Sequence, residues 1–436
     1  MSRWVWWAVS LLVLAILNFS LSPRAASANP SSRISMRSHQ RKAAWPVCNI
    51  KDFGAKCDGR TDDSSAIRAA IQAANENGLV YIPAGTCVFS APISAGKVQI
   101  RGVGKNVSIL KYKGASGSAF TFDYPIPMYM LSPGMSDLSL IGPGPETNTT
   151  GVLLGGKAGA EGARFDSVEI ADFGTGITNS KWVFLTEFKD CYLSNGVDAK
   201  LNGSPTSGEN MRFVHCTFDH TTKPSSVIVD GGDYMQPEFV DCSFDGAVLR
   251  IQSGMVSVVG GHFEDTCPGG KYFAIIGDGR HDATVSIVNA TLNADGHYSY
   301  PSKSLFHVRS GSNLNVEDLQ ACTLIHAFNV MDVDAGGKGS IINLMVPNCG
   351  GWANSPLAAT GEGSANVEQI ATPGSGTEVN NVITRPIQFG KDGPAISWGA
   401  GAPGGSCANG SLYLNKSGKS GSTLYVCVTG NWAAAK

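Results

Sequence analysis

The chain has 436 residues and a net charge of −2, and 16% of its residues are charged. No domain of the chain is strongly basic, which argues against a nucleic-acid partner. The 53 glycines and the scarcity of long helical patterns favour an all-β chain with many tight turns.

The N-terminus has the pattern of a secretory signal peptide. One early arginine precedes a long apolar run, and small residues at Ala26 and Ala28 suit a signal peptidase. We expect residues 1–28 to be removed after Ala28, which predicts a secreted or periplasmic protein. The alternative is an uncleaved membrane anchor, since the apolar run is almost long enough to span a bilayer. Residues 29–46 are polar and are read as a linker.

The segment 47–93 predicts a helix followed by strands. Asp62 or Asp63 is placed to cap a helix whose apolar residues share one face, and Gly78 is expected to end it. These apolar residues are Ile67, Ala70, Ile71 and Ala74. An amphipathic helix of this kind can cover the open end of a repeat protein.

A six-residue frame recurs along the next 190 residues of sequence. Its clearest copies are "FKDCYL" from Phe188, "FVHCTF" from Phe213 and "FVDCSF" from Phe239, and five further copies follow the same pattern with spacings of about 19–30 residues. A second apolar strand follows several copies, for example "AVLRIQSG" at 247–254. Each repeat therefore predicts short strands and turns, stacked as the coils of a parallel β-helix.

The parity of the frame requires a bend at its third position, because the apolar residues before and after it are out of phase. That position holds short polar residues, which tolerate the left-handed conformation. They are Asp137, Asp190, His215, Asp241, Asn289 and Asp318. The fourth position places Cys191, Cys216 and Cys242 in an inward column about 4.8 Å apart. A column does not offer tetrahedral ligands, so we expect these cysteines to pack rather than bind a metal.

The segments "DFGAKCDGRTDDSSAIRAAI" and "VYIPAGTCVF", together with the coils, resemble the pectate-lyase-like superfamily over residues 47–350. The superfamily includes rhamnogalacturonases, epimerases and phage tailspike depolymerases. The resemblance implies a right-handed parallel β-helix that acts on acidic polysaccharides, and it implies that Asp62 and Asp63 are structural. It also suggests a disulfide between Cys57 and Cys87, leaving Cys48 unassigned.

The catalytic signature of polygalacturonases is missing from this sequence. Gly246 and Ala247 stand where two aspartates are expected, and the frame places His262 on a strand rather than in a Gly-His-Gly turn. No Arg-x-Lys element follows, and the Asp-Pro-His-Asp sequence of mannuronan epimerases is also missing. The polygalacturonase mechanism therefore does not transfer to this chain.

Three acids follow successive copies of the frame at the same position: Asp219, Asp245 and Glu264. Adjacent coils would separate Asp219 from Asp245 by about 5 Å, near the spacing of retaining glycosidases. Asp219 and Glu264 would be about 9.6 Å apart, at the upper edge of the inverting range. Crowded acids raise one another's pKa, as a general acid requires. The alternative is that all three are solvated turn acids.

The following strand presents a second set of outward residues. Asp230 and Arg250 are the candidates for catalysis, because a cation beside an acid suits β-elimination at a uronate. The candidate substrate-binding residues are Lys200, Asp233, Tyr234, Arg280, His281, His307 and Arg309. We expect no metal and no cofactor, although calcium could bind through Asp230 and Asp233 if the protein is a lyase.

From about Gly350 the repeat fades. Residues 351–395 read as an irregular connecting segment, and residues 396–436 as a hairpin module in which Cys407 and Cys427 form a disulfide. Its aromatic residues Tyr413, Tyr425 and Trp432 could stack on sugars, but packing within a small module is favoured. No pairing is assigned to Cys267, Cys322 and Cys349.

Three functions are compatible with these patterns. The first is an exported glycoside hydrolase of an acidic or bacterial exopolysaccharide that uses Asp219, Asp245 and Glu264. The second is a polysaccharide lyase that uses Arg250 or Lys200 with Asp230. The third is a non-catalytic carbohydrate-binding or assembly protein. The substrate and the oligomeric state are not determined by the sequence.

Overall fold

The computed structural model describes part of the chain residue by residue. The described residues are 46–75, 78–125, 132–203, 209–219, 225–230, 236–264, 271–294, 304–323, 329–345, 359–361, 364–370, 380–382, 387–388, 394–399, 401–415, 417 and 423–435. The expected signal peptide, almost all of the expected linker, Asp233, Tyr234, Cys267 and Cys349 lie outside these residues. Most of the expected connecting segment 351–395 does so too.

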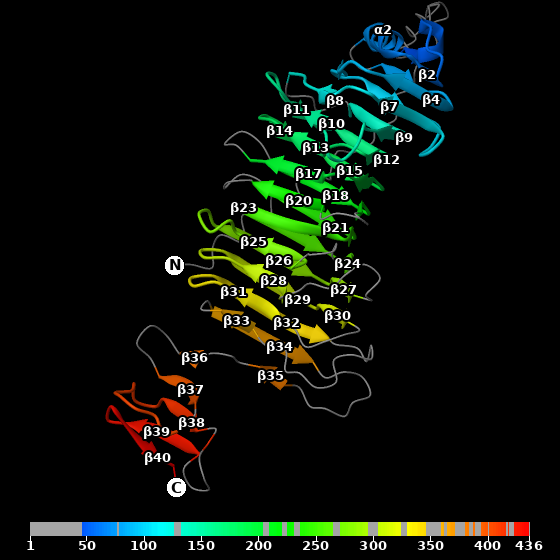
Figure 1. Cartoon of the computed structure of the whole chain (residues 1–436). Helices are drawn as coiled ribbons and strands as arrows, with labels where there is room; N and C mark the ends of the chain where they lie inside the picture. Colours follow the sequence, from blue (N-terminus) through cyan, green and yellow to red (C-terminus); the bar gives the residue numbers. More distant parts are fainter. Residues whose placement is uncertain are drawn as a thin grey trace, which may run out of the picture. The chain divides into compact units, whose positions relative to one another are not determined.

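Short strands stack in three parallel columns and form a β-helix, which confirms the expected fold (Figure 1). The first column contains β1 (Val47–Asn49), β3 (Leu79–Tyr81), β6 (Gln99–Arg101), β9 (Gly134–Ile141), β12 (Arg164–Ala171), β15 (Glu187–Lys189), β18 (Met211–Val214), β21 (Pro237–Val240), the second half of β23 (Ala247–Val259), β26 (Ala283–Val288), β29 (Asn313–Glu317), β32 (Lys338–Met345) and β34 (Ser364–Ile370).

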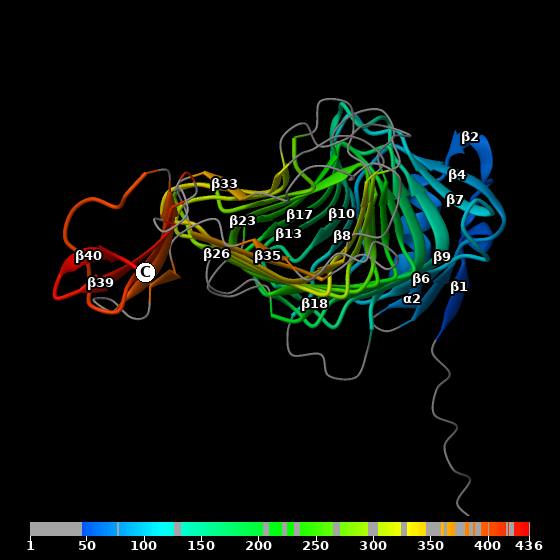
Figure 2. The ribbon, with the colours of Figure 1, turned by 90° about the horizontal axis from the view of Figure 1, so that it is seen from below.

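The second column contains β2 (Asp58–Asp62), β4 (Gly85–Phe89), β7 (Ser108–Tyr112), the second halves of β9 and β12, β16 (Tyr192–Ser194), β19 (Thr217–Asp219), β22 (Ser243–Asp245), β24 (His262–Glu264), β27 (Thr291–Ala294) and β30 (Gln320–Thr323). The third contains β5 (Ile93–Ser94), β8 (Ser116–Phe122), β10 (Asn148–Leu154), β13 (Thr175–Asn179), β17 (Val197–Asn202), β20 (Ser225–Asp230), the first half of β23, β25 (Ala274–Ile276), β28 (Ser304–Val308), β31 (Asn329–Val333) and β33 (Ala359–Gly361). Figure 2 shows strands of successive coils superimposed around a common interior.

The remaining elements are small. They are the 3-10 helix η1 (Ile50–Phe53), the helix α2 (Ser64–Ala74), the pair β11 (Ala160–Glu161) and β14 (Val183–Phe184), and β35 (Asn380–Val382), which runs antiparallel to β34. Among the residues that the structure describes, no helix is long and apolar enough to cross a membrane.

The bend predicted between the first and second columns is present. All six residues expected there have φ between 49° and 56°, in the left-handed region. Gly260 takes the same place in the coil that ends in β24, with φ of 68°. The short polar residues at this position therefore have a conformational reason, because they adopt αL more readily than branched side chains do.

Ladders of identical side chains fill the interior. The rings of Phe165, Phe188, Phe213 and Phe239 stack with centroid separations of 4.7, 4.8 and 5.0 Å. These values match the spacing of neighbouring parallel strands. A phenylalanine at the same place in each coil therefore stacks on the equivalent phenylalanines in the coils before and after it. The sequence repeat thus produces the same ring contact in successive coils.

The cysteine column also lies inside, as predicted. Cys191, Cys216 and Cys242 are free thiols, and each is at most 2% exposed. Each sulfur lies 3.3–3.6 Å from backbone carbonyl oxygens, one of which belongs to the preceding coil. Burial raises the pKa of Cys191 and of Cys216. These thiols are therefore packing groups, not reactive ones.

The N-terminal cap corrects one prediction. Helix α2 buries Ile67, Ala70 and Ala74 as expected, but it ends at Ala74, because Asn75 at φ of 56° closes it before Gly78. Asp63 makes no side-chain capping bond. The amide of Ser64 donates instead to Asp62 Oδ1 at 2.8 Å.

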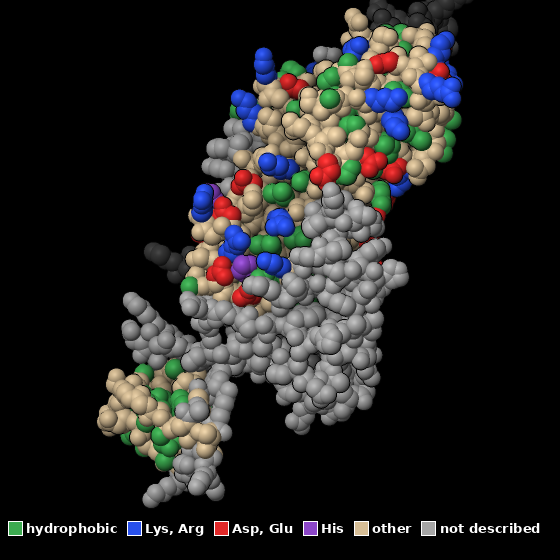
Figure 3. All heavy atoms as spheres, in the orientation of Figure 1, with side chains coloured by type: hydrophobic (Ala, Val, Ile, Leu, Met, Phe, Trp, Pro, Cys, Tyr) green, Lys and Arg blue, Asp and Glu red, His purple; other side chains and the backbone are tan. Residues whose placement is uncertain are grey.

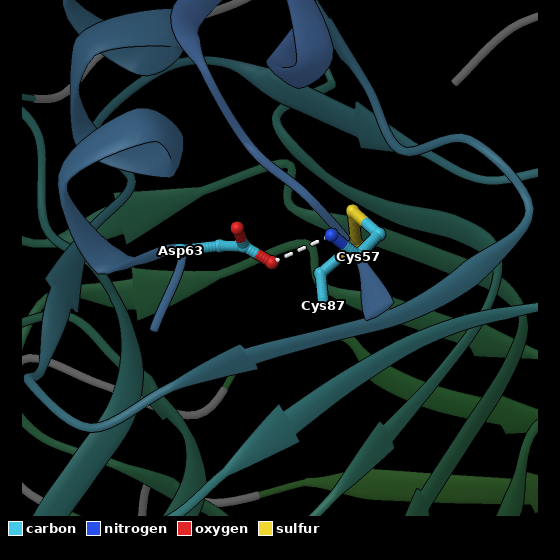
Figure 4. Close-up of side chains that lie close together, drawn as sticks. All are labelled: Cys57, Asp63 and Cys87. Carbon is cyan, nitrogen blue, oxygen red and sulfur yellow. Dashed lines mark hydrogen bonds between the residues drawn. A yellow bond between two sulfur atoms is a disulfide. The ribbon is translucent and has the colours of Figure 1, made fainter. Parts of the chain in front are cut away.

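Asp63 has a different structural role. Its buried carboxylate accepts a hydrogen bond from the amide of Lys56 at 2.6 Å. It accepts a second from the amide of Cys57 at 3.0 Å, which Figure 4 shows. Cys57 forms the expected disulfide with Cys87, and Cys48 is a buried free thiol. Asp63 thereby fixes the loop that carries Cys57 onto the first coil.

The C-terminal module is larger than the predicted hairpin. The expected strands pair antiparallel as β38 (Leu412–Asn415) and β39 (Leu424–Val428), but they belong to a five-stranded sheet with β36 (Ile387–Gln388), β37 (Ala395–Gly399) and β40 (Asn431–Ala434). Cys407 and Cys427 form the predicted disulfide. The Tyr413 ring lies 6.3 Å from that of Tyr425 and 5.9 Å from that of Trp432, so the three aromatics pack against one another.

Candidate functional site

The three acids predicted to share a register do so on the outer face of the second column. Asp219 pairs with Asp245, and Asp245 pairs with Glu264. They are, however, the last residues of β19, β22 and β24 rather than turn residues. Strand geometry therefore fixes them more firmly than the prediction of turn acids implied, and all three are partly buried.

A second row of polar side chains lies beside the acids, because residues two apart on a strand share a face. Tyr192, Thr217, Ser243 and His262 are neighbours in register across four coils. Sequence analysis did not select Tyr192, Ser243 or His262. The alternation of the strand would have found them, since Ser243 stands two residues before Asp245, and His262 two before Glu264. His262 lies on a strand, as predicted.

Asp245 is the centre of a connected group. Ser243 donates its hydroxyl hydrogen bond to Asp245 Oδ1. His262 Nε2 lies 3.2 Å from Ser243 Oγ, 3.2 Å from Glu264 Oε2 and 3.6 Å from Asp245 Oδ1. The side chains of Asp245, His262 and Glu264 are 27%, 40% and 31% exposed. The group is therefore partly shielded from water but accessible to a ligand.

The environment of Asp245 favours its protonated form. Burial is the main cause and raises the pKa of its carboxyl group. The hydrogen bond from Ser243 and the charge of His262 lower this pKa, whereas the charges of Glu264 and Asp219 raise it further. The net pKa is above the usual value for an aspartate, which is the direction a general acid needs.

Tyr192 binds Asp219, the acid in the coil before Asp245. Its hydroxyl donates to Asp219 Oδ2. Burial, and then the neighbouring Asp219, raise the pKa of Tyr192, so the phenol keeps its proton. Asp219 therefore has a fixed donor on one side and Asp245 in the next coil on the other.

The outer face of the third column carries the second set of candidates. Lys200, Ile228, Arg250, Ile275 and His307 follow one another in register over five coils. Arg250 Nε donates to Ser226 Oγ at 2.9 Å, and Asp230 Oδ1 accepts from Ser253 at 3.2 Å. Asp230 and Arg250 thus each have a neutral hydroxyl as a partner, and no ion pair joins them within the described residues.

His307 and the adjoining loop contribute further groups to this face. His307 Nε2 lies 3.0 Å from Asp334 Oδ1, and its ring is 4.8 Å from that of Tyr272. Tyr272 donates to Asp332 at 3.0 Å. Figure 3 shows basic, acidic and histidine side chains gathered on the surface over β25, β28 and β31.

Arg280 and His281 are held by an acid that the sequence analysis did not select. The amides of both residues and the His281 ring are hydrogen-bonded to Asp278 at 2.7, 2.8 and 3.0 Å. Desolvation opposes the ionisation of Asp278, but these hydrogen bonds outweigh it and lower its pKa to about 2. Both candidates are exposed loop residues.

Two groups of described side chains bring potential metal ligands together. In the first, Cys57 and Cys87 are joined in a disulfide and Asp63 binds backbone amides, so no thiolate is available. In the second, atoms of Asp245, His262 and Glu264 lie within 4.8 Å of one another. Carboxylate and imidazole groups suit divalent cations. Hydrogen bonds among Ser243, Asp245, His262 and Glu264 account for the geometry of this group without a bound cation.

Comparison with known proteins agrees with the fold. The family described as rhamnogalacturonase A/epimerase, pectate lyase-like, matches residues 47–131. Probable rhamnogalacturonase A of Aspergillus oryzae is 38% identical over 102 residues, which cover 22% of this chain and 21% of that protein. Alginate lyase 7 of Azotobacter vinelandii is 35% identical over 142 residues, covering 26% of this chain and 15% of that protein. The matched region thus spans about a fifth or less of these relatives.

Solved structures extend the likeness to most of the coils. The gp42 tailspike of Acinetobacter phage vb_AbaP_AS12 aligns with a TM-score of 0.55 at 12% identity, covering 84% of this chain and 70% of that one. Tailspike protein 4 of bacteriophage CBA120 gives 0.52 at 17% identity, covering 79% and 47%. At these identities the likeness concerns the fold. The family match is confined to residues 47–131, and beyond that segment the likeness to known proteins is one of fold, a parallel β-helix.

Proposed function

We propose that the protein is an exported enzyme that cleaves glycosidic bonds of a polysaccharide. Its relatives include a probable rhamnogalacturonase, which supports a polysaccharide substrate. The observation that carries the proposal is the row of three carboxyl groups in register, with a raised pKa at the middle one, Asp245. Two carboxyl groups of different proton affinity are what glycoside hydrolysis requires.

Asp245 is the general acid in this mechanism. It protonates the glycosidic oxygen as the bond to the anomeric carbon breaks. Asp219 lies one coil away, about 4.8 Å by strand spacing, close to the separation found in retaining enzymes. Its carboxylate attacks the anomeric carbon and forms a glycosyl-enzyme. Water then releases the sugar, and the ionised Asp245 accepts the proton of that water.

Glu264 and His262 position the acid. The imidazole lies between Glu264 and Asp245, with Nε2 3.2 Å from Glu264 Oε2 and 3.6 Å from Asp245 Oδ1. Its charge and the Ser243 hydroxyl limit how far the pKa of Asp245 rises. We expect no metal to take part, so chelation with EDTA should leave the rate unchanged. A rate lost on chelation and restored by one divalent cation would move these residues into a metal site.

A polysaccharide lyase is the second candidate, and the third-column face favours it. A lyase needs a cation beside the uronate carboxylate, a base for the α-proton and an acid for the leaving oxygen. Arg250, His307 and Tyr272 are residue types that could fill these roles. In this mechanism the elimination leaves a double bond in the product rather than adding water.

Product analysis separates the candidates. The wild-type chain and the variants Asp245→Asn, Arg250→Gln and His307→Gln are incubated with a panel of acidic polysaccharides. Reducing ends without ultraviolet absorbance, abolished by Asp245→Asn, support the hydrolase. Absorbance from a new double bond, abolished by Arg250→Gln and His307→Gln, supports the lyase and excludes the hydrolase. Binding without either product would support a non-catalytic protein.

A further inference from the structure

The sheet of the C-terminal module has one face that is packed within the module. Paired residues share a face of a sheet, and the faces alternate along each strand. The register of β38 and β39 places Asn415 and Cys427 on the packed face, where they are 9% and 2% exposed. Residues before β38 cover this face, because Cys407 is bonded to Cys427 and the amide of Gly401 donates to Asn415 Oδ1 at 3.0 Å.

The opposite face of this sheet, the open face, is apolar. The register places six large apolar side chains on it: Ile396 from β37, Leu412 and Leu414 from β38, and Leu424, Val426 and Val428 from β39. None of the six is buried, and Leu414 and Val428 are 48% and 54% exposed. Figure 3 shows hydrophobic side chains at the surface of the module. A contiguous apolar face of this kind marks a contact surface.

The side-chain charge of the module has a single sign. The sequence of residues 394–436 contains three lysines and neither aspartate nor glutamate. The whole chain has a net charge of −2, so the positive charge is a local property of the C-terminal segment. Apolar side chains combined with positive charge suit a partner that has negative groups at its surface and apolar groups beneath them.

The open face is too small for a stable pair with a second copy of this chain. Its sheet has five strands, of at most five residues each, and so measures roughly 19 Å by 17 Å, about 300 Å². A stable protein interface takes about 800 Å² from each partner. Two copies would also bring their positive charges together. A lipid surface extends beyond the module and supplies the opposite charge, so neither objection applies to it.

We propose that the open face of the C-terminal module binds an anionic lipid surface. The exposed side chains of Leu414 and Val428 enter the boundary between headgroups and acyl chains, and the positive charge of the module attracts it to negative headgroups. The module thereby holds the exported chain at a membrane. This inference concerns the module alone and does not depend on the function proposed for Asp245.

Vesicle flotation tests the proposal. The chain from residue 29, which lacks the apolar N-terminal run, is mixed with vesicles of phosphatidylcholine alone or of phosphatidylcholine and phosphatidylglycerol in equal parts. We expect binding to the anionic vesicles to be about tenfold tighter at about 50 mM salt, and to weaken about tenfold at about 500 mM salt, because salt screens the charges. Equal binding to both kinds of vesicle, or no binding to the anionic vesicles, would overturn the proposal.

Variants locate the contact on the open face. The double variant Leu414→Gln/Val428→Thr should weaken binding to anionic vesicles about tenfold, because it removes exposed apolar surface. Val103→Thr, which changes an exposed valine between β6 and β7, should leave binding unchanged. Non-reducing mass spectrometry checks that the double variant keeps the bond between Cys407 and Cys427. Unchanged binding in a double variant with this bond intact would refute the site.

Light scattering without vesicles tests the other occupant of the open face. We expect the wild-type chain and the double variant to have the same mass in solution. A stable dimer of the wild type that the double variant dissociates would assign the open face to a second copy and overturn the lipid proposal.

Discussion

Three aspartates of one chain show how position sets the role of a side chain. Asp63 is buried and accepts two amide hydrogen bonds, so its side chain is part of the fold. Asp241 is about half exposed at a left-handed bend. Asp245 is mostly buried beside two other acids, and its pKa is raised. The environment of Asp245 is the one that suits proton transfer.

We expect Asp245→Asn to lower the cleavage rate by several orders of magnitude, because Asn cannot donate the proton. Asp241→Asn is the matched control: Asn accepts the left-handed conformation, and the rate should not change. A raised pKa means that ionisation of Asp245 opposes folding, so the stability this group contributes at low pH is lost as pH rises through its pKa. Thermal unfolding at neutral pH should therefore show Asp245→Asn at least as stable as the wild type.

Asp63→Ala should destabilise the first coil without affecting turnover. It leaves the amides of Lys56 and Cys57 without their acceptor, at a cost of about 3 kcal/mol. Asp62→Ala removes the bond to the Ser64 amide and should cost about 1 kcal/mol. Denaturant unfolding compares the two. Equal losses would mean that Asp63 acts merely as a helix cap, as the sequence had suggested.

At the scale of the element, the coil was predictable because its signals are local and repeated. The frame gives the alternation of each strand, and its third position gives the bend that φ values near 50° confirm. The register of Asp219, Asp245 and Glu264 follows from the same repeat. The connections of His262 were not predictable, because they depend on side-chain directions between coils. The role of Asp63 likewise depends on a tertiary contact to a loop.

The stacked phenylalanines are the element most sensitive to truncation. Phe213 lies between Phe188 and Phe239 and is fully buried, so Phe213→Ala opens a cavity in three coils at once. We expect a loss of about 3–5 kcal/mol in the free energy of unfolding. Phe213→Leu keeps most of the volume and should cost less than half as much. A loss below 1 kcal/mol for Phe213→Ala would contradict the importance of the ladder.

The C-terminal module depends on its disulfide for a different reason. Its sheet is small, and the bond between Cys407 and Cys427 closes a segment with a sequence separation of 20. A loop of this length contributes about 3 kcal/mol through the unfolded state. The double variant Cys407→Ala/Cys427→Ala should therefore make the module sensitive to limited proteolysis while residues 47–345 stay resistant. Equal resistance of both proteins would contradict this role.

At the scale of the whole molecule, the proposed function assigns chemistry to one column of the β-helix and substrate binding to another. The second column carries Asp219, Asp245 and Glu264 and the third carries Arg250, and each face is ordered by the register of its own column. The stacking that places the phenylalanines in a ladder inside also places the candidate acids in register outside. A substitution on the second-column face should then change kcat and leave KM unchanged. A substitution on the third-column face should change KM and leave kcat unchanged.

The pH dependence of the rate tests this separation. Asp245 must be protonated, so the rate should fall as pH rises through its raised pKa. The Ser243 hydrogen bond lowers that pKa, so Ser243→Ala should raise it and move the alkaline limb of the kcat profile to higher pH. Arg250→Gln should instead raise KM and leave that limb in place, because it removes binding shared by substrate and transition state. A limb that moved with Arg250→Gln and stayed with Ser243→Ala would place the proton-transfer group on the third column and reassign the chemistry to that face.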